Sequence, residues 1–317
     1  MRRRGACVQN LGKVLVIANP AARNGEGKRA AEYVRSASAT LSSEAFDFRM
    51  TESPGQATRD AAGARGYDTV LVLGGDGVIH EAVGGLMQLP REERPTLGVI
   101  PCGNGNDYAR TLGMGLDWRD ALSRLVFAEA RPVDVGLCNG EPFVQTLSFG
   151  LDAAIALGTH ERRRRTGTRG TLLFVEEGVS QLARNRTAYD YVCSFDGGAS
   201  QEGSMLLFAV QVGPTYGGGF RICPDADPAD GRFDVCIARP PMGFLRTALM
   251  LLSSKEGGHL RLAKRSLVLA RPQRLHLEFD CPPPVQIDGE LIEGSTFDIR
   301  TDPQALTVLF ARERARL

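Results

Sequence analysis

The segment Asp68–Gly77, DTVLVLGGDG, carries an apolar run directly into a glycine-rich turn. The same combination recurs where the apolar run Leu97–Pro101 leads into Gly103–Asp107, GNGND. Glycine lacks a Cβ, so such turns adopt positive φ and let backbone N–H groups approach a ligand closely. A helix that begins at such a turn adds partial positive charge. One turn of this kind is compatible with an ordinary loop, but the pair predicts a phosphate-binding site.

Each turn also carries a carboxylate. Asp76 and Asp107 repel phosphate, so we expect them to orient a metal ion, a ribose hydroxyl or the loop itself. No lysine lies in or near either turn, and the P-loop pattern G-x-x-x-x-G-K-[ST] is absent. Backbone N–H groups, helix dipoles, arginine and metal are therefore the groups that would bind phosphate here.

The order of apolar segments predicts two domains. Up to about residue 131, strand patterns alternate with helical ones, which is typical of an α/β domain with a mainly parallel sheet. In such sheets ligands bind at the carboxyl ends of the strands, where both glycine turns lie. Beyond 131, short strand patterns predict a mainly antiparallel β-sandwich or barrel, with helical patterns at 172–183 and 243–253. We expect domains at 11–131 with a returning 303–317, and at 132–302.

The composition limits the class of protein. The chain has 317 residues, 43% hydrophobic and 24% charged, with a formal net charge of +1. These values are typical of globular proteins and give no electrostatic reason to expect a nucleic-acid partner. The longest apolar stretches, such as Met205–Val212, are too short to span a bilayer, and the basic N-terminus lacks the apolar stretch of a secretory signal. Seven scattered cysteines without a C-x-x-C pair indicate reduced thiols, so we expect a cytoplasmic protein.

Short motifs follow one another over nearly the whole chain. They are a strand with Asn-Pro at Val14–Pro20, Thr51 with Gly55–Ala57, GGDGVIHE at Gly74–Glu81, PCGNGNDYAR at Pro101–Arg110, SFGLDA at Ser148–Ala153, GGGFRICPDADPADGRFD at Gly217–Asp234 and QIDGE at Gln286–Glu290. In this order they resemble the motifs of the diacylglycerol-kinase-type lipid kinases, a group that also holds sphingosine kinases, ceramide kinases and bacterial relatives. Each match alone is weak, whereas the collinear series is specific.

The resemblance implies a nucleotide-binding α/β domain, a β-sandwich domain and an active site in the cleft between them. It implies transfer of the γ-phosphoryl group of ATP to a lipid hydroxyl, with Mg²⁺ as a cofactor. The aspartate of D-G-E, here Asp288, would be the general base, and Glu290 and Asp152 would belong to a supporting carboxylate network. The P-[DN]-A-x-x-x-D-G turn would hold a structural Mg²⁺ through the Asp230 side chain, with backbone carbonyls of Asp227 and Arg232.

The nucleotide-binding residues follow from the same resemblance. They are Asn19, Thr51, Gly74, Gly75, Asp76, Gly77, Val78, Ile79, His80, Glu81, Gly103, Asn104, Gly105, Asn106 and Asp107. The chain departs from the family pattern at three of them. Val78 replaces a threonine and removes a hydroxyl donor, His80 replaces an asparagine, and Asn104 replaces a threonine but stays polar. Val78 and His80 resemble the sphingosine kinase branch, so the lipid substrate stays open between diacylglycerol and sphingoid types.

Several alternatives remain from the sequence. Asp288-Gly289 also fits an ordinary hairpin turn, and the acidic segment around Asp230 fits a plain acidic loop. An enzyme that acts on a membrane lipid needs peripheral contact with the bilayer, for which the apolar segment 242–252 is a candidate if it is not core. The alternative functions are an NAD kinase-like enzyme and an inactive lipid- or nucleotide-binding module. The oligomeric state is open, with a homodimer as one option.

Overall fold

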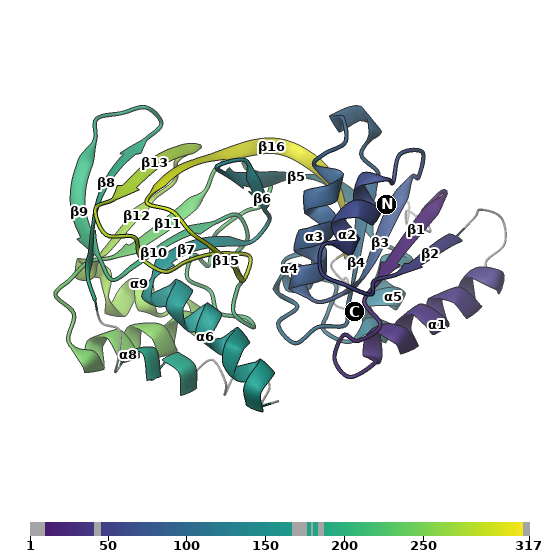
Figure 1. Cartoon of the computed structure of the whole chain (residues 1–317), viewed down its shortest axis with the longest axis horizontal. Coiled ribbons are helices and arrows are strands. Elements are labelled where there is room, and N and C mark those ends of the chain that lie inside the picture. Colours follow the sequence, from purple (N-terminus) through teal and green to yellow (C-terminus); the bar gives the residue numbers. More distant parts are fainter. Residues whose placement is uncertain (1–9, 41–45, 167–175, 179, 183–186, 313–317) are drawn as a thin grey trace, which may run out of the picture. The chain divides into compact units, whose positions relative to one another are not determined.

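The structure is a computed structural model that describes residues 10–40, 46–166, 176–178, 180–182 and 187–312 (Figure 1). The chain forms two compact units. One contains the residues up to Val133 and those from Gln304 onwards, and the other is Asp134–Pro303. Two strands, β5 (Glu129–Cys138) and β16 (Thr296–Phe310), carry the chain across the boundary between these units.

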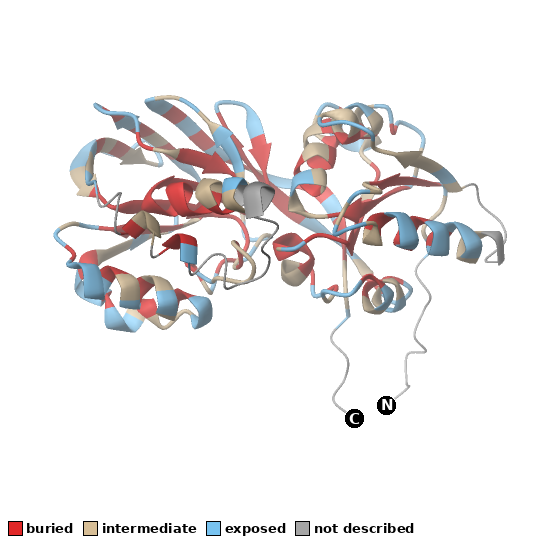
Figure 2. Cartoon of the chain, turned by 60° about the horizontal axis from the view of Figure 1, so that its bottom comes forward, coloured by how far each residue is buried: buried red, intermediate tan, exposed pale blue. Residues whose placement is uncertain are grey.

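The first unit is built on a parallel sheet with the strand order β2-β1-β3-β4. Its strands are β1 (Val14–Ala18), β2 (Phe46–Met50), β3 (Thr69–Gly74) and β4 (Thr96–Pro101). Every residue of β1 and β3 is buried, as expected for strands covered on both faces, and Figure 2 colours the buried strands red. Val308 of β16 pairs with Leu97 of β4 in parallel, which adds the end of β16 to this sheet.

Five of the described helices surround this sheet, and four of them pack as the pairs α2–α3 and α1–α5 (Figure 1). The five are α1 (Glu26–Thr40), α2 (Gln56–Ala62), α3 (Asp76–Leu86), α4 (Asp107–Thr111) and α5 (Trp118–Leu125). Helices α2 and α3 pack so closely that a Cβ on Gly85 would lie 2.2 Å from the Thr58 carbonyl oxygen. Helices α1 and α5 meet where the rings of Tyr33 and Trp118 are 5.4 Å apart and the Trp118 indole N–H donates to Glu26 at 2.8 Å.

The second unit is a sandwich of two sheets. One sheet has the antiparallel order β12-β11-β10-β7-β14-β15, and the other contains β16, β13, β8 and β9, with β5 and β6 beside β16. The aromatic rings of Phe149, Phe208 and Phe297 interlock between the sheets, with ring centroids of Phe149 and Phe297 5.0 Å apart. The strands are β6 (Glu141–Phe143), β7 (Thr146–Gly150), β8 (Tyr189–Phe195), β9 (Gln201–Met205), β10 (Leu207–Gln211), β11 (Asp234–Ala238), β12 (Leu267–Ala270), β13 (Arg274–Phe279), β14 (Val285–Ile287) and β15 (Glu290–Ile292).

A layer of helices lies beside the six-stranded sheet (Figure 1). It consists of α6 (Leu151–Thr166), α8 (Phe244–Ser253) and α9 (His259–Leu262). A second apolar cluster joins this layer to the strands, since Met250 of α8 packs with Ala209 and Cys236. None of the described helices combines the length and the apolar character that crossing a bilayer requires.

The predicted fold class is confirmed: the chain has an α/β unit with a mainly parallel sheet and an antiparallel sandwich unit. Two elements differ from the sequence prediction. Helix α6 was not predicted, because its first half is apolar and its second half is rich in arginine, so no stripe runs along one face. The expected boundary between residues 302 and 303 lies within one strand, β16, in which Gln304 has φ 52. The predicted helix at 172–183 lies partly outside the described residues.

Candidate active site

The two glycine turns of the first unit are in direct contact. A Cβ on Gly103 would lie 2.4 Å from the Cα of Gly75, and a Cβ on Gly75 would lie 3.0 Å from the Cα of Gly103. The contact follows from the parallel pairing of Gly74 with Pro101, which brings both strand ends to the same edge of the sheet. The turns therefore converge as the sequence predicts, and only glycine fits at the point of contact.

The carboxylates of both turns gather around Gly105. A Cβ there would lie 2.7 Å from Oδ2 of Asp76 and 3.1 Å from Oδ2 of Asp107, so these two oxygens are within about 6 Å of each other. The Tyr108 N–H donates to Oδ1 of Asp76 at 3.2 Å, and Arg110 Nε lies 3.8 Å from Oδ1 of Asp107. A pair of carboxylates at this distance is suited to share a divalent cation with a phosphate group.

Asn106 shapes the second turn from within. Its side-chain oxygen accepts the Gly103 N–H at 2.9 Å, and its side-chain amide donates to the Gly103 carbonyl at 3.0 Å. The residue is buried and has φ 54, in the left-handed region that asparagine tolerates better than most residues. Asn106 was predicted to bind nucleotide, and the structure gives its side chain the task of holding the turn.

Glu81 also has a structural task. Its two carboxylate oxygens accept the backbone N–H groups of Gly55 at 2.9 Å and Ala57 at 3.1 Å. These N–H groups belong to the start of α2, which has no side-chain cap of its own. A carboxylate at a helix N-terminus stabilises the helix both by hydrogen bonding and by interaction with its dipole. The predicted binding residue Glu81 therefore joins α3 to α2.

Asn19 and Thr51 follow β1 and β2 at the same edge of the sheet as the glycine turns. The Asn19 N–H donates to the carbonyl of Leu73 at 3.0 Å, and its side-chain oxygen accepts the N–H of Ala21 at 3.0 Å. The Thr51 N–H donates to the carbonyl of Ala18 at 2.8 Å. Both residues are half-buried, so the structure brings them to the edge where the predicted phosphate site lies.

The remaining predicted residues differ in exposure. Gly77 and Asn104 are exposed on the two turns, whereas Ile79 and His80 are buried within α3. Val78 leans back on the first turn, because a Cβ on Gly74 would lie 2.9 Å from the Cβ of Val78. Val78 therefore packs against the end of β3.

In the second unit, Asp288 lies in the turn between β14 and β15 with φ 46. Its carboxylate accepts three backbone N–H groups: Val144 at 2.9 Å on Oδ2, and Gln145 at 3.0 Å and Thr146 at 2.9 Å on Oδ1. The Asp288 N–H donates in turn to the Thr146 carbonyl at 2.8 Å. The side chain thus holds the β14–β15 turn to the start of β7, a structural role that the sequence motif did not reveal.

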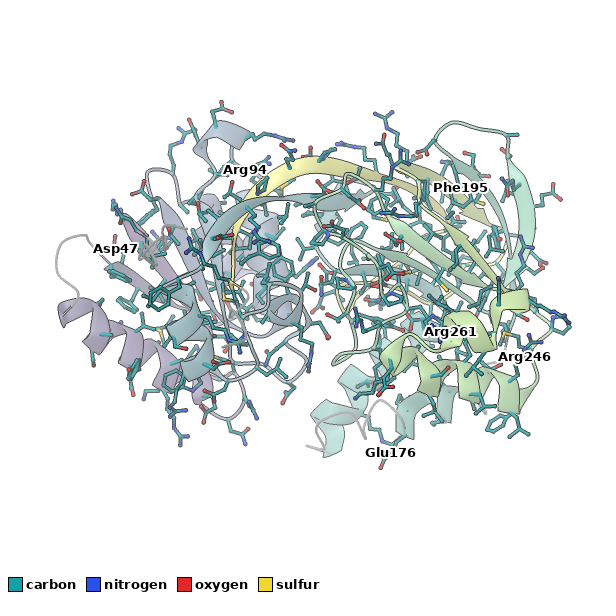
Figure 3. The ribbon with its side chains drawn as sticks, turned by 180° about the vertical axis from the view of Figure 1, so that it is seen from behind. Asp47, Arg94, Glu176, Phe195, Arg246 and Arg261 are labelled. Atoms are coloured by element: carbon teal, nitrogen blue, oxygen red, sulfur yellow. The ribbon has the colours of Figure 1, made fainter. Side chains whose placement is uncertain are left out.

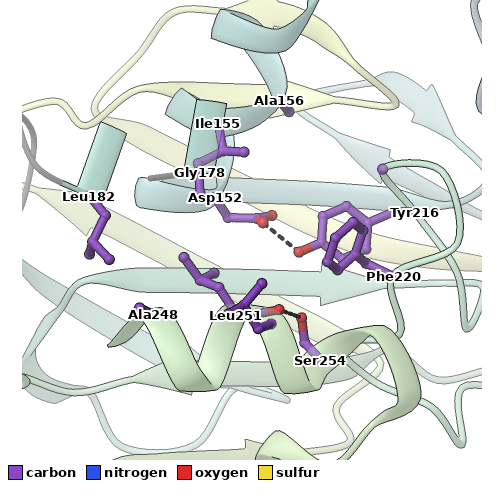
Figure 4. A pocket seen from close by; sticks show the side chains of 12 residues that line it. Asp152, Ile155, Ala156, Gly178, Leu182, Tyr216, Phe220, Ala248, Leu251 and Ser254 are labelled. Carbon is purple, nitrogen blue, oxygen red and sulfur yellow. Dashed lines mark hydrogen bonds between the residues drawn. The ribbon is translucent and has the colours of Figure 1, made fainter. Parts of the chain in front are cut away.

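A pocket in the second unit opens beside the other end of β7. Its cavity has a volume of about 60 Å³, and its walls come from α6, α8 and the segment around Tyr216 (Figure 4). One charged side chain, Asp152, is among the residues that line it. The other lining residues are Ile155, Ala156, Gly178, Leu182, Tyr216, Gly217, Phe220, Ala248, Leu251, Leu252 and Ser254. The pocket is therefore an apolar chamber with one polar end.

The polar end is a buried pair of side chains. The Tyr216 hydroxyl donates to Oδ1 of Asp152 at 2.5 Å, and Figure 4 shows this bond at the pocket wall. Oδ2 of Asp152 is buried and accepts no hydrogen bond from the residues that the structure describes. Burial raises the pKa of Asp152, and the hydrogen bond from Tyr216 opposes this rise. Burial and the neighbouring Asp152 raise the pKa of Tyr216 well above its ordinary value, so the hydroxyl keeps the proton that it donates.

The raised pKa of Asp152 predicts a pH-dependent effect of Asp152→Asn. The folded protein binds the carboxyl proton of Asp152 more tightly than the unfolded chain does. The stability that this protonation contributes to the wild-type protein is therefore complete below the unfolded-chain pKa near 3.8. It is lost as the pH rises through the folded pKa. The amide is neutral and its oxygen still accepts the Tyr216 hydroxyl, so the variant should unfold at a higher temperature than wild type at pH 8. Thermal unfolding between pH 5 and pH 8 measures the difference in unfolding temperature between the variant and wild type, which should become smaller as the pH falls. A variant less stable than wild type at pH 8 would contradict the account.

The three predicted catalytic carboxylates do not form one cluster. Asp152 follows the last residue of β7 and Asp288 is bonded to its first, and the strand between them spans roughly 13 Å at its usual rise. Glu290 is exposed on β15, where it pairs across the hairpin with Ile287. Asp152 therefore belongs to the apolar pocket, whereas Asp288 and Glu290 belong to the hairpin.

The predicted metal turn carries an internal cation. Arg271 pairs through Nη2 with Oδ2 of Asp230 and through Nε with Oδ1 of Asp234, the latter at 3.3 Å. The neighbouring N–H of Gly231 donates to the buried Asp134 at 2.6 Å. Among the described residues, no group of three or more histidine, cysteine, aspartate or glutamate side chains is suited to hold a metal ion. The guanidinium therefore pairs with Asp230, the one side chain of the predicted Mg²⁺ site, and that site stays a prediction.

Removal of this guanidinium should make the turn sensitive to Mg²⁺. Without Arg271, the carboxylates of Asp230 and Asp234 repel each other, so Arg271→Ala should unfold at a lower temperature and regain stability with added Mg²⁺. Thermal unfolding with Mg²⁺ or EDTA measures the effect. Arg131→Ala is the matched control, because Arg131 is about as exposed and its pair with Glu129 lies elsewhere. An equal Mg²⁺ response in wild type and Arg271→Ala would show that a cation binds beside Arg271.

The sequence motifs missed Tyr216 and Arg271. Both act on a carboxylate far away in the sequence, since Tyr216 bonds to Asp152 and Arg271 pairs with Asp230. For Tyr216 the sequence did offer one signal, because this residue directly precedes the glycine-rich stretch that begins at Gly217.

Comparisons with known proteins agree with this arrangement. Residues 13–138 match the diacylglycerol kinase catalytic domain, and residues 145–310 match the YegS C-terminal NAD kinase beta sandwich-like domain. The chain is 31% identical over 245 residues to a diacylglycerol kinase of Bacillus subtilis, covering 76% of this chain and 77% of that protein. It is 30% identical over 302 residues to a probable YegS-like lipid kinase of Pseudomonas aeruginosa, covering 93% of each chain.

The fold has a counterpart among solved structures. A putative diacylglycerol kinase from Bacillus anthracis superposes with a TM-score of 0.77 at 22% identity, covering 95% of this chain and 97% of that one. At this level of identity the likeness concerns the fold, which both units share with that protein.

Proposed function

This chain belongs to the family of diacylglycerol kinases and YegS-like lipid kinases, and on that premise we propose that it transfers the γ-phosphoryl group of ATP to a hydroxyl of a lipid. The observation that carries the lipid as acceptor is the pocket of the second unit, whose described lining residues have apolar side chains except for Asp152 and the hydroxyl groups of Tyr216 and Ser254. Acyl chains bind in such a chamber by burial of apolar surface.

The first unit would bind ATP. The contact between Gly75 and Gly103 leaves room for a phosphate chain to approach the backbone where side chains would otherwise stand. ATP would arrive as its Mg²⁺ complex, and the described residues suited to contact that cation are Asp76 and Asp107, whose oxygens lie on the same side of Gly105. The ion would neutralise charge on the phosphates.

The reaction needs a proton acceptor, for which we propose Asp288. The resemblance of QIDGE to the D-G-E motif supports this role, and three backbone N–H groups fix the orientation of the carboxylate. Asp288 would take the proton of the lipid hydroxyl as that oxygen attacks the γ-phosphorus. The bond from the γ-phosphorus to the bridging oxygen breaks, the electron pair leaves with ADP, and Asp288 later releases the proton to water.

An NAD kinase-like activity is the alternative, because the second unit matches a domain that is described as NAD kinase-like. The pocket argues against NAD as the acceptor, since Asp152 is the one charged side chain among the described residues that line it, and Asp152 would repel phosphate. An inactive binding module is a weaker alternative, because Asp76, Asp107 and Asp288 are all present.

The rate of ADP release with different acceptors distinguishes these functions. The full chain would be assayed with Mg²⁺ and ATP against diacylglycerol, a sphingoid base and ceramide in mixed micelles, and against NAD in solution. We expect acceptor-dependent ADP release with one of the lipids, which also identifies the lipid class. Release with NAD alone would support the alternative enzyme, and no release with intact ATP binding would support the inactive module.

A further inference from the structure

Helix α8 exposes apolar side chains along the side that faces away from the sheet. Leu245 is 75% exposed, Leu249 is 59% exposed and Leu252 is 53% exposed, and their spacing of four and three residues places them on one stripe. Thr247 and Met250 of the same helix are buried. The sequence left open whether this segment is core or a docking surface, and the structure contains both faces on one helix.

The exposed apolar side chains of the described residues are concentrated here. Eleven large apolar side chains are exposed in the described part of the chain, and five of them are Phe244, Leu245, Leu249, Leu252 and Leu262. The outer side of a surface helix is ordinarily polar, yet α8 contains a single charged residue, Arg246. A concentration of this kind on a protein surface marks an interaction site.

Positive charge surrounds the same stripe. Residues 244–266 contain five basic residues and one acidic residue. The rest of the chain contains 33 basic and 36 acidic residues, so the excess of positive charge lies in this segment. All five basic side chains are exposed, and Figure 3 labels Arg246 on α8 and Arg261 on α9. Arg246, Arg261, Lys264 and Arg265 make no ion pair with any residue that the structure describes. This charge is complementary to anionic headgroups.

The stripe is continuous with the apolar pocket. Leu252 is both exposed and part of the pocket wall, and Ala248 and Leu251 of the same helix also line the pocket. Leu245 and Leu249 do not line it. Helix α8 thus joins an apolar chamber on one side to an apolar, basic-rimmed surface on the other.

We propose that this surface docks on a lipid bilayer that carries anionic headgroups. We call it the α8 face and define it as Phe244, Leu245, Leu249, Leu252 and Leu262 with the surrounding Arg246, Arg261, Lys264 and Arg265. The leucines enter the boundary between headgroups and acyl chains, and the basic side chains remain among the headgroups. Only the purpose of the docking rests on the proposed function: it would hold the pocket beside the membrane that supplies the lipid substrate.

Co-sedimentation of the full chain with vesicles tests the docking without ATP or turnover. Wild type should bind vesicles of phosphatidylcholine with phosphatidylglycerol more tightly than vesicles of phosphatidylcholine alone. The double variant Leu245→Gln/Leu249→Gln should weaken binding by about tenfold or more on both kinds of vesicle, because it removes inserted apolar surface. Lys264→Glu/Arg265→Glu should weaken binding by about tenfold or more on anionic vesicles alone, and this loss should vanish at high salt.

A matched control comes from the first unit. Val126 and Phe127 are also exposed apolar side chains, at 41% and 42% exposure, but they lie outside the α8 face. Val126→Gln/Phe127→Gln should therefore bind vesicles like wild type. With a short-chain diacylglycerol dispersed as monomers, Leu245→Gln/Leu249→Gln should keep the wild-type kcat/KM. With the same lipid class in anionic vesicles, its kcat/KM should fall.

Several results would overturn the proposal. The proposal fails if wild type does not bind anionic vesicles at low salt. It also fails if Leu245→Gln/Leu249→Gln binds vesicles as tightly as wild type. A leucine double variant that turns a dimer into a monomer in sedimentation velocity without losing vesicle binding would assign the α8 face to a second copy of the chain. Vesicle binding that follows these predictions in a protein that phosphorylates no lipid would overturn the proposed function and leave the docking surface in place.

Discussion

Asp288→Asn should lower kcat for lipid phosphorylation by roughly 10²–10⁴-fold, the usual contribution of a positioned proton acceptor. The affinity for ATP should stay within about twofold of wild type, because the glycine turns that we propose as the phosphate site belong to the other unit and do not involve this residue. Rates under saturating ATP and lipid, together with calorimetric ATP titration, measure both quantities. A variant with at least about half of the wild-type kcat would remove Asp288 from the mechanism.

The structure adds a second effect that must be separated from the first. The Asp288 carboxylate accepts the N–H groups of Val144, Gln145 and Thr146, and an amide presents a donor in place of one acceptor oxygen. A buried N–H left without an acceptor costs about 1–3 kcal/mol, so the unfolding temperature should also fall. Formate added to Asp288→Ala provides the control. If this small carboxylate restores turnover without restoring the unfolding temperature, the lost rate comes from the missing proton acceptor and not from lost stability.

Gly103→Ala should weaken ATP binding by about a hundredfold or more. Its Cβ would stand 2.4 Å from the Cα of Gly75 and 2.8 Å from Oδ1 of Asn106, so the two turns must move apart and lose the arrangement of their N–H groups. The obstacle is backbone, which cannot rotate away as a side chain can. Calorimetric titration of the full chain with Mg²⁺ and ATP measures the affinity.

Gly84→Ala is the matched control for this substitution. It lies on α3, which begins at the first turn, and no atom lies within 4 Å of the position that its Cβ would occupy. Alanine in a helix interior is more favourable than glycine by up to about 1 kcal/mol, so this variant should bind ATP normally and unfold at a higher temperature. If Gly103→Ala bound ATP as tightly as Gly84→Ala, the turns would not be the nucleotide site.

The first unit was the more predictable part. An apolar strand that ends in GGDG and another that ends in GNGND suffice to predict parallel strands with converging turns, because parallel pairing aligns strand ends. What the motifs could not assign is the task of each side chain within them. Asn106 and Glu81 belong to binding motifs yet bond to Gly103 and to the start of α2, since backbone groups far apart in the sequence meet only after folding.

The second unit was less predictable for the same reason. The strand patterns indicated a sandwich, but helix α6 has no continuous apolar stripe, and Asp152 gains its surroundings from Tyr216 and α8. The family resemblance that groups Asp152 with Asp288 does not record that β7 separates them. Likewise, the motif around Asp230 does not record that Arg271, 41 residues further along the chain, pairs with this carboxylate.

The most direct measurement of the central claim is the identity of the labelled product after radiolabelled γ-phosphate is supplied as ATP with Mg²⁺. The purified chain would be incubated with NAD and with a diacylglycerol or sphingoid lipid in mixed micelles, beside Gly103→Ala and Asp288→Asn. The account predicts that wild type transfers the label to a lipid hydroxyl and that both variants lose this transfer, with ATP binding lost only in Gly103→Ala. Label found in NAD, or lipid labelling that both variants retain, would contradict it.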